Sequence, residues 1–397
     1  QRPYGAPLRA EEMSEFKAWG DYPAAAEAFW LDQVERATGR IGDEALEKIT
    51  PAVGRLSDLF TTERPKHKFP EYFADPELLA GYGIFFLPQS FIRTSFALAH
   101  AYELRQWRPA FGEISILDLG SGPGSCGVAA AHCLAQLTDA KITLTAVDRS
   151  PMALVAAEGF AHATLGARVS VRSRVGDAAR SETWPEGSYD IIVAGFVMNE
   201  MTQLDPTNLL AWVDQLKAHL NPGGLILILE PALRVTAQRL QRLSDEVSAQ
   251  GVLTRIGSDL DDDVCAQLLG AEHWNHEARA WKTPDSTDFV NRRLHRDLRD
   301  IKYAFAAFTS ATVAPLPAQC ARLVSDVQII KGLLRFITVR QGLIEAVEVP
   351  TRGLSKHEVK KLAAQFGRGD VVRHDQPPAA KIRLAKSGDF EVFWSPR

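Results

Sequence analysis

The stretch that most constrains this chain is Ile116–Gly127, ILDLGSGPGSCG, in which an apolar run meets three closely spaced glycines. The apolar residues fit a buried strand, and the residues after the glycines fit the start of a helix. Gly120, Gly122 and Gly124 let the backbone turn tightly and come close to a ligand, while the helix start offers free N–H groups. The segment therefore predicts a ligand-binding strand–turn–helix unit.

Strand-like and helix-like patterns alternate around this unit. Apolar runs predict strands at Ile114–Leu119, Ile142–Val147, Val169–Val175, Tyr189–Gly195 and Leu225–Glu230. Helical periodicity lies between them, at Ser125–Leu137, Pro151–Thr164, Asp205–Leu220 and Leu233–Ala249. Strands that are apolar almost throughout are typical of a parallel sheet with helices on both faces. The fold class is therefore α/β, and we expect the late run Tyr303–Thr309 to join the sheet as an antiparallel strand.

Two further regions flank this core. Helix-period apolar positions in residues 9–63 predict a helical N-terminal region, followed by a basic linker at Arg64–Pro70 and a long helix at Phe86–Trp107. Downstream, short β-rich runs surround a predicted helix at Ser355–Phe366, which Ser355 and Glu358 begin as a capping box. The β-rich runs are Cys320–Val327, Leu333–Arg340, Leu343–Val349, Val371–Arg373, Lys381–Leu384 and Phe390–Trp394. This order predicts a small β-rich C-terminal domain, for which an oligonucleotide/oligosaccharide-binding (OB) barrel is one arrangement. The predicted domains are residues 1–108, 109–314 and 315–397.

Composition excludes several classes of protein. The 397 residues are 46% apolar and 24% charged with a net charge of −4, which is ordinary for a globular protein and lacks the overall basic field of a nucleic-acid binder. The tail from Thr351 to Arg397 is basic, which fits either a solvated surface or a contact with RNA phosphates. Four scattered cysteines favour a reducing compartment. No membrane span or signal peptide is visible, although the start at Gln1 leaves an earlier leader open.

Three features downstream in the sequence indicate which ligand the glycine turn binds. Asp148 ends the second predicted strand, where an acid accepts hydrogen bonds from ribose hydroxyls. Asp177 ends the third strand, where an acid can hold an adenine amino group. The turn Asn221–Gly224 precedes the fifth strand. A dinucleotide-binding protein is the alternative.

Together these features resemble the class I S-adenosylmethionine-dependent methyltransferases over roughly residues 110–310, which implies a Rossmann-like sheet and S-adenosylmethionine as cofactor. The resemblance also implies roles for single residues. Asp148, with Arg149 beside it, holds the ribose; Asp177 and Ala178 face the adenine; Phe196 and Asn199 border the methyl group and the acceptor. The turn residues that line the methionine and the ribose are Gly120, Ser121, Gly122 and Gly124.

No catalytic residue is assigned, because methyl transfer depends mainly on proximity and orientation and a general base is optional. Glu200 is either a base or a surface residue. Asp118 either faces the methionine ammonium or bonds the turn backbone. The fourth-strand motif GFVMNEM also differs from the motif of methyltransferases that act on base amino groups.

Three further stretches resemble the small-ribosomal-subunit methyltransferase-like family of bacteria and mitochondria. They are LPQSFIRTSFALAHAYEL, YDIIVAGFVMNEM and GGLILILEPA, and CARLVSDVQIIKGLLRFITVRQG with FGRGD resembles that family's C-terminal region. The resemblance implies the small subunit or its rRNA as partner, in the bacterial cytoplasm or alternatively the mitochondrial matrix. The alternatives are a non-catalytic ribosome-assembly factor with this fold and a methyltransferase for a small molecule or a protein.

The segment Val264–Trp281 is where typical members of that family hold an iron–sulfur cluster. Here Cys265 stands alone, and Asn275 occupies the cysteine position of the family's Trp-Cys-His step. A cluster needs about four thiolates, so we expect no metal cluster. Zinc on Cys265, His273 and His276 is the alternative, although their spacing matches no common site. We predict a metal-free lid over the cofactor cleft, packed by its two tryptophans.

A predicted helix at Asp288–Tyr303 presents five basic residues between aspartates. It is either a salt-bridged surface or an RNA-phosphate contact.

Overall fold

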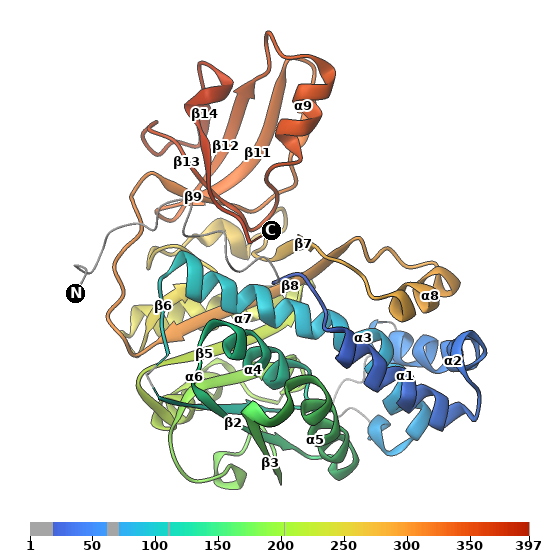
Figure 1. Ribbon diagram of the computed structural model, residues 1–397. Helices are drawn as coiled ribbons and strands as arrows, with labels where there is room; N and C mark the ends of the chain where they lie inside the picture. The colour runs from blue at the N-terminus through green and yellow to red at the C-terminus, as the bar shows by residue number, and fades with distance from the viewer. Residues whose placement is uncertain (1–18, 62–70, 110–111, 202, 397) are drawn as a thin grey trace.

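A computed structural model describes residues 19–61, 71–109, 112–201 and 203–396. Its centre is a mixed sheet with the order β3-β2-β1-β4-β5-β8-β6, in which β7 also pairs with β8 (Figure 1). The strands are β1 (Glu113–Leu119), β2 (Lys141–Asp148), β3 (Val169–Val175), β4 (Tyr189–Gly195), β5 (Leu220–Pro231), β6 (Thr254–Gly257), β7 (Glu277–Ala280) and β8 (Asp300–Thr309). Strands β1 to β5 are parallel and β8 is antiparallel to β5. The predicted Rossmann-like sheet and its late antiparallel strand are therefore confirmed.

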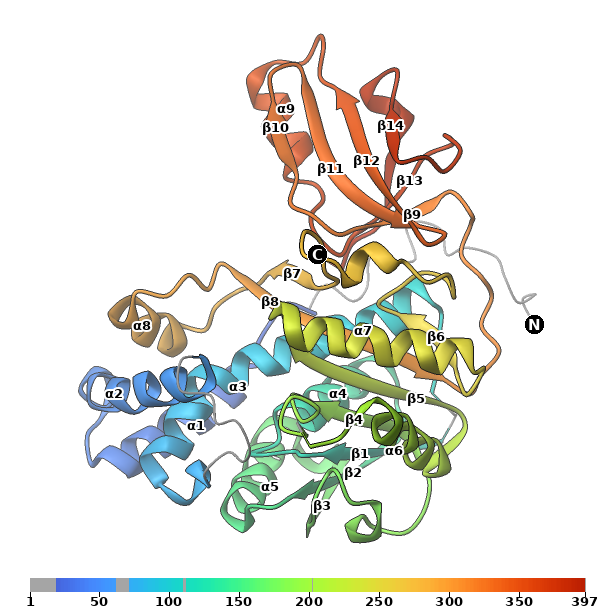
Figure 2. The ribbon, with the colours of Figure 1, turned by 180° about the vertical axis from the view of Figure 1, so that it is seen from behind.

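Helices cover both faces of this sheet because its strand residues alternate between two cores. In β5, Leu225, Leu227 and Leu229 pack with α3 and α4, whereas Ile226 and Ile228 pack with α6 and α7 on the opposite face. The helices after the parallel strands are α4 (Ser125–Leu137), α5 (Pro151–Leu165), α6 (Pro206–Ala218) and α7 (Arg234–Ala249). Figure 2 shows α7 and α6 on the face that Figure 1 hides.

The N-terminal region is helical, as predicted. It contains α1 (Ala24–Thr38), α2 (Gly42–Thr61), the short turn η1 (Tyr72–Ala74) and α3 (Pro76–Ala99). The predicted helix at Phe86–Trp107 has the wrong ends. Asp75 caps α3 by accepting hydrogen bonds from the N–H groups of Glu77 and Leu78, so the helix begins at Pro76, and a π-helical turn at His100–Leu104 ends it before Trp107. The predicted linker Arg64–Pro70 lies outside the described residues.

The C-terminal part forms a second sheet with the order β14-β12-β11-β9-β13-β15, to which β10 adds beside β11. Its elements are β9 (Cys320–Leu323), β10 (Gln328–Ile330), β11 (Leu333–Arg340), β12 (Leu343–Pro350), α9 (Lys356–Ala363), β13 (Val371–Arg373), β14 (Lys381–Arg383) and β15 (Glu391–Trp394). The capping box of Ser355 and Glu358 is present. This sheet stands on one side of the main sheet in both views (Figures 1 and 2).

The predicted helix at Asp288–Tyr303 is wrong beyond its first turns. Helix α8 spans Asp285–Leu294 and ends at His295, whose φ of 51° is left-handed. Residues Asp300–Tyr303 pair with β7 instead, and β8 pairs with β5 from Tyr303 onward, so tertiary pairing overrides the local helical spacing.

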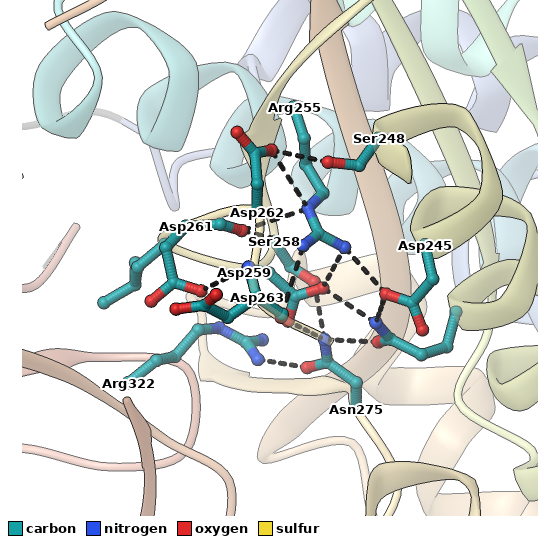
Figure 3. A network of polar contacts seen from close by, with 12 residues as sticks. Asp245, Ser248, Arg255, Ser258, Asp259, Asp261, Asp262, Asp263, Asn275 and Arg322 are labelled. Atoms are coloured by element: carbon teal, nitrogen blue, oxygen red, sulfur yellow. Dashed lines mark hydrogen bonds and ion pairs between the residues drawn. The ribbon is translucent and has the colours of Figure 1, made fainter. Parts of the chain in front are cut away.

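Buried charges join the two sheets. Asn275 donates from Nδ2 to Gln241 Oε1, Ser258 Oγ and Asp259 Oδ1, each at 2.9 Å, and accepts from Arg322 of β9 (Figure 3). Arg255 bonds the Asp245 carboxylate at 2.7 Å in the same network. These side chains are almost fully buried, and a buried charge is tolerated only when it is paired and hydrogen-bonded. The network therefore fixes the position of the second sheet.

Candidate active site

The carboxyl ends of β1, β2 and β4 open into a cavity of about 1100 Å³. Ligands of open α/β sheets bind at this edge, where the strand order reverses between β1 and β4. Nine of the ten predicted cofactor residues line the cavity: Gly120, Ser121, Gly122, Asp148, Arg149, Asp177, Ala178, Phe196 and Asn199. Gly124 does not line it. It precedes α4 with a φ of 94° and packs against Ala157, so its part is to turn the chain into the helix.

The glycine turn has no room for side chains. Gly120, Gly122 and Gly124 have φ values of 68°, 52° and 94°, which favour glycine. A Cβ on Gly120 would lie 2.0 Å from Val197 Cγ1, and a Cβ on Gly122 would lie 3.3 Å from the Phe73 ring. The N–H groups of Gly120 and Ser121 both donate to the Val147 carbonyl, at 2.8 and 3.0 Å. The turn is thus fixed to the end of β2.

Asp148 holds the same turn through its carboxylate. Its Oδ2 accepts from Gly122 N at 2.8 Å, and its Oδ1 accepts from Ser150 N at 2.8 Å. Burial raises the pKa of this carboxyl, and the two backbone hydrogen bonds oppose the rise. Each oxygen has a second lone pair, so the carboxylate can also accept hydrogen bonds from two ribose hydroxyls.

Two indoles fix the loop after β3. Trp184 Nε1 donates to the Asp177 carbonyl at 2.9 Å, and Trp212 Nε1 donates to the Ala178 carbonyl at 2.8 Å. Asp177 Oδ1 accepts from Ala179 N at 2.9 Å. The loop is therefore held rigid beside the glycine turn, as an adenine-binding position requires.

The end of β4 carries a backbone conformation that is unusual for a side chain. Phe196 has a φ of 62°, in the left-handed region that costs a non-glycine residue about 1 kcal/mol or more. Its N–H donates to the Leu229 carbonyl, and Asn199 Nδ2 donates to the Phe196 carbonyl, both at 2.7 Å. These bonds hold the Phe196 ring in the cavity wall, and such outliers cluster at functional sites.

Asp118 lies beneath the turn and is not part of the cavity wall. It is 1% exposed, and its Oδ2 accepts from Gly127 N at 2.8 Å. Of the two roles that the sequence left open for Asp118, the structure shows the backbone contact. Burial raises the pKa of this carboxyl to about 7.

The second half of the cavity was not predicted. Helix α3 presents Tyr82, Phe86, Gln89 and Arg93 on one face, at helical spacings of four, three and four residues. Further rings come from α2 and η1: Phe60, Tyr72 and Phe73. Centroids of neighbouring rings are 4.4 to 6.4 Å apart, so the rings form one continuous aromatic wall. The spacing on α3 was visible in the sequence, but it resembled core packing.

Arg149 and Glu200 form an ion pair across the cavity, with 3.1 Å between Arg149 Nη2 and Glu200 Oε2. Glu200 is thus an ion-paired residue of the cavity wall. Its carboxylate lies at the boundary between the glycine turn and the aromatic wall.

The predicted lid is wrong in its position. No residue of Val264–Trp281 lines the cavity. The segment lies between the two sheets, where Cys265 packs with Val324 and Ile344. Only Trp274 reaches toward the cavity, because its Nε1 donates to the carbonyl of the wall residue Ala232 at 2.9 Å. Among the described residues, no group of three or more His, Cys, Asp or Glu is placed to hold a metal ion.

The family described as Methyltransferase domain matches residues 117–226, which span the glycine turn and the strands that surround it. Residues 117–226 form a methyltransferase domain. S-adenosylmethionine is the cofactor of this domain.

Several solved methyltransferases are distantly similar to the chain. Magnesium protoporphyrin IX methyltransferase from Synechocystis PCC 6803 is 10% identical, with 66% of this chain and 97% of that chain covered and a TM-score of 0.34. The N-methyltransferase NodS from Bradyrhizobium japonicum WM9 is 16% identical, with coverages of 57% and 98% and a TM-score of 0.32. An O-methyltransferase family protein from Burkholderia thailandensis is 15% identical, with coverages of 66% and 69% and a TM-score of 0.37. Such TM-scores carry no conclusion about the acceptor. No curated protein matches the chain significantly.

The cavity fits the cofactor. The glycine turn borders the cavity mostly with backbone, and the Asp148 carboxylate keeps free lone pairs beside it. When bound, S-adenosylmethionine would supply an electrophilic sulfonium methyl group to a lone pair of the acceptor. The chain's own residues orient the two reactants and keep water out, which suffices for much of the rate of such a displacement. The individual cofactor contacts stay predictions.

Proposed function

We propose that this chain methylates a base of small-subunit ribosomal RNA. The observation that carries the proposal is the division of one cavity into a cofactor half and an aromatic half. Enzymes that modify a base in RNA stack it on aromatic side chains after it leaves the helix. The wall of Tyr72, Tyr82 and Phe86 offers such a surface next to Phe196, where the methyl group is expected.

Two further features support RNA as the acceptor. The connection of β9, β11, β12, α9, β13 and β14, with β9 paired to both β11 and β13, is typical of an OB barrel, a fold that binds oligonucleotides. The resemblance to the small-ribosomal-subunit family supports that subunit as partner, with the bacterial cytoplasm or the mitochondrial matrix as the compartment. Among the described residues, no helix is long and apolar enough to cross a membrane.

A small-molecule or protein acceptor is the second candidate, and the surface charge favours it. The cations expected to bind RNA near α8 are paired with acids: Arg292 with Asp288 at 2.6 Å and Arg299 with Asp297 at 2.7 Å. The cavity wall likewise contains both carboxylates and cations. The cleft is thus not the wide basic groove that is typical of RNA enzymes.

Methyl transfer from labelled cofactor tests the proposal. Wild-type protein should label precursor RNA of the small subunit and not free nucleosides, and Asp148→Asn should label far less. Label in small molecules or proteins but not in RNA would favour the second candidate. No label in any acceptor despite cofactor binding would favour a non-catalytic assembly factor.

A further inference from the structure

The aromatic half of the cavity contains a guanidinium that has no carboxylate partner among the described residues. Arg93 of α3 lines this half, and its guanidinium lies 5.5 Å from the centroid of the Phe196 ring. Its Nη2 donates to Gln89 Oε1 at 3.2 Å, while its buried Nε has no hydrogen-bond partner. Across the described ranges, no carboxylate forms an ion pair with Arg93.

Three buried arginines elsewhere have carboxylate partners, whereas the buried Arg105 donates to the Leu260 carbonyl at 3.0 Å. Arg255 pairs with Asp245, Arg322 with Glu277, and Arg340 with Glu345. This pairing is expected because an uncompensated buried charge is costly. Arg93 has only the Gln89 amide oxygen as an acceptor, and it lies in the cavity wall, where a ligand can supply an anion. Its pKa is lowered to about 10 by burial, so the side chain remains a cation at neutral pH.

The surroundings of Arg93 define what can pair with it. Tyr82 and Phe86 stack at 5.8 Å on the same helix face, and Phe60 meets Phe86 edge-on at 5.2 Å. A flat ring fits beside these half-buried rings. A planar guanidinium suits the two oxygens of a carboxylate or phosphate.

We propose that the methyl acceptor is a planar aromatic ring that carries an anionic group, with the ring on the aromatic wall and the anion on Arg93. The proposal rests on the proposed function and deepens it. A nucleotide phosphate and a free aromatic carboxylate are the two sources of this chemistry. Arg93 positions the acceptor, and the methyl donor is held by the opposite half of the cavity.

Paired probes on the full chain test this site. Protein saturated with S-adenosylhomocysteine is titrated with benzoate against benzamide, and with adenosine 5′-monophosphate against adenosine. In wild type, the anionic member of at least one pair should bind about 10-fold tighter or more, as expected for a charge-assisted bidentate contact. Arg93→Gln should abolish that preference and Arg93→Lys should keep part of it. A preference within the nucleotide pair alone identifies a nucleotide, and one within the benzoate pair alone identifies a free acid.

The controls separate this proposal from the proposed function. Arg292→Gln removes an exposed cation far from the cavity wall and should behave like wild type. Arg93→Gln should bind S-adenosylhomocysteine within about twofold of wild type, which shows that the fold and the cofactor half are intact. Equal binding of both members of each pair to wild type, or a preference that survives in Arg93→Gln, would overturn the anion site. If S-adenosylhomocysteine does not bind at all, the proposed function fails, and the benzoate pair on the cofactor-free protein still decides the role of Arg93.

Discussion

The two halves of the cavity are built in different ways. The cofactor half consists of backbone held by backbone and carboxylates: Gly120 and Ser121 bond Val147, and Asp148 bonds Gly122. The aromatic half consists of side chains from α2, η1 and α3 that pack on one another. Few residue types can produce the backbone geometry of the cofactor half. The shape of the aromatic half, in contrast, changes whenever one of its rings is replaced. This contrast predicts that the cofactor is common to the fold and that the acceptor is particular to this chain.

The largest effect should come from the glycine turn. Gly120→Ala places a Cβ 2.0 Å from Val197 Cγ1 at a φ of 68°. Strain and overpacking of this kind cost roughly 2–6 kcal/mol together, so the affinity for S-adenosylhomocysteine should fall about 100-fold or more by calorimetry. Gly187→Ala is the matched control, because Gly187 has a φ of 117° but nothing within 4 Å. Equal losses in both variants would contradict a role for the space at the turn.

The next effect concerns the acid of the cofactor half. Asp148→Asn keeps the shape of the side chain and removes its charge. Hydrogen bonds to a charged group contribute roughly 1.5–3 kcal/mol, so the affinity for the cofactor should fall about 10- to 100-fold. Asp139→Asn, on a fully exposed carboxylate, is the control. An unchanged affinity in Asp148→Asn would remove this residue from the cofactor site.

Burial of Asp118 beneath the glycine turn should make the stability of the protein depend on pH. The folded state holds the Asp118 proton up to a pKa of about 7, above its ordinary value of 3.8. The folded state therefore binds more protons than the unfolded state between these values, and the contribution of Asp118 to stability falls as pH rises through this window. At about 1.4 kcal/mol per pKa unit, the free energy of unfolding of wild type in urea should fall by about 3–4 kcal/mol from pH 4 to pH 7.5 relative to Asp118→Asn. If the free energy of unfolding changed with pH in the same way in wild type and in Asp118→Asn, the Asp118 carboxyl would not carry this proton.

Changes in the aromatic half should separate acceptor from cofactor. Phe86→Leu removes a ring from the wall but keeps an apolar side chain. Loss of one stacking contact corresponds to roughly 1–1.5 kcal/mol, so methyl transfer should fall about 10-fold through KM while the affinity for S-adenosylhomocysteine stays within about twofold. A comparable loss of cofactor affinity would mean that the two halves are not independent.

The smallest effect is expected at the boundary between the halves. Glu200 is paired with Arg149, and exposed ion pairs contribute about 1 kcal/mol or less. Glu200→Gln should therefore lower kcat by less than about fivefold, since methyl transfer needs no general base. Glu200 would instead be a base if Glu200→Gln lowered kcat by 100-fold or more and if kcat rose with pH in wild type but not in this variant.

The sequence revealed the cofactor half because contiguous residues encode it. The glycines, Asp148 and Asp177 each follow a strand, so the parallel sheet brings them to one edge. The aromatic half depends on how α2, η1 and α3 dock onto that edge, which local spacing does not encode. Tyr82 and Phe86 have the same spacing as core residues, and Arg93 resembles any helical arginine until its surroundings are known.

The same limit explains the misplaced lid. The residue pattern of Val264–Trp281 predicted a lid over the cofactor cleft, but the partners of this segment lie far away in the sequence. Asn275 bonds Asp259 on one side and Arg322 of the second sheet on the other. The absence of a metal cluster there stays a prediction, which an iron assay on the purified protein checks.

Equilibrium dialysis with labelled S-adenosylmethionine tests the central claim most directly. Wild-type protein should bind about one molecule per chain, S-adenosylhomocysteine should displace it, and Gly120→Ala should bind almost none at the same concentration. Absence of binding by folded wild-type protein, or equal binding by Gly120→Ala, would contradict the assignment of the glycine turn as the cofactor site of a methyltransferase.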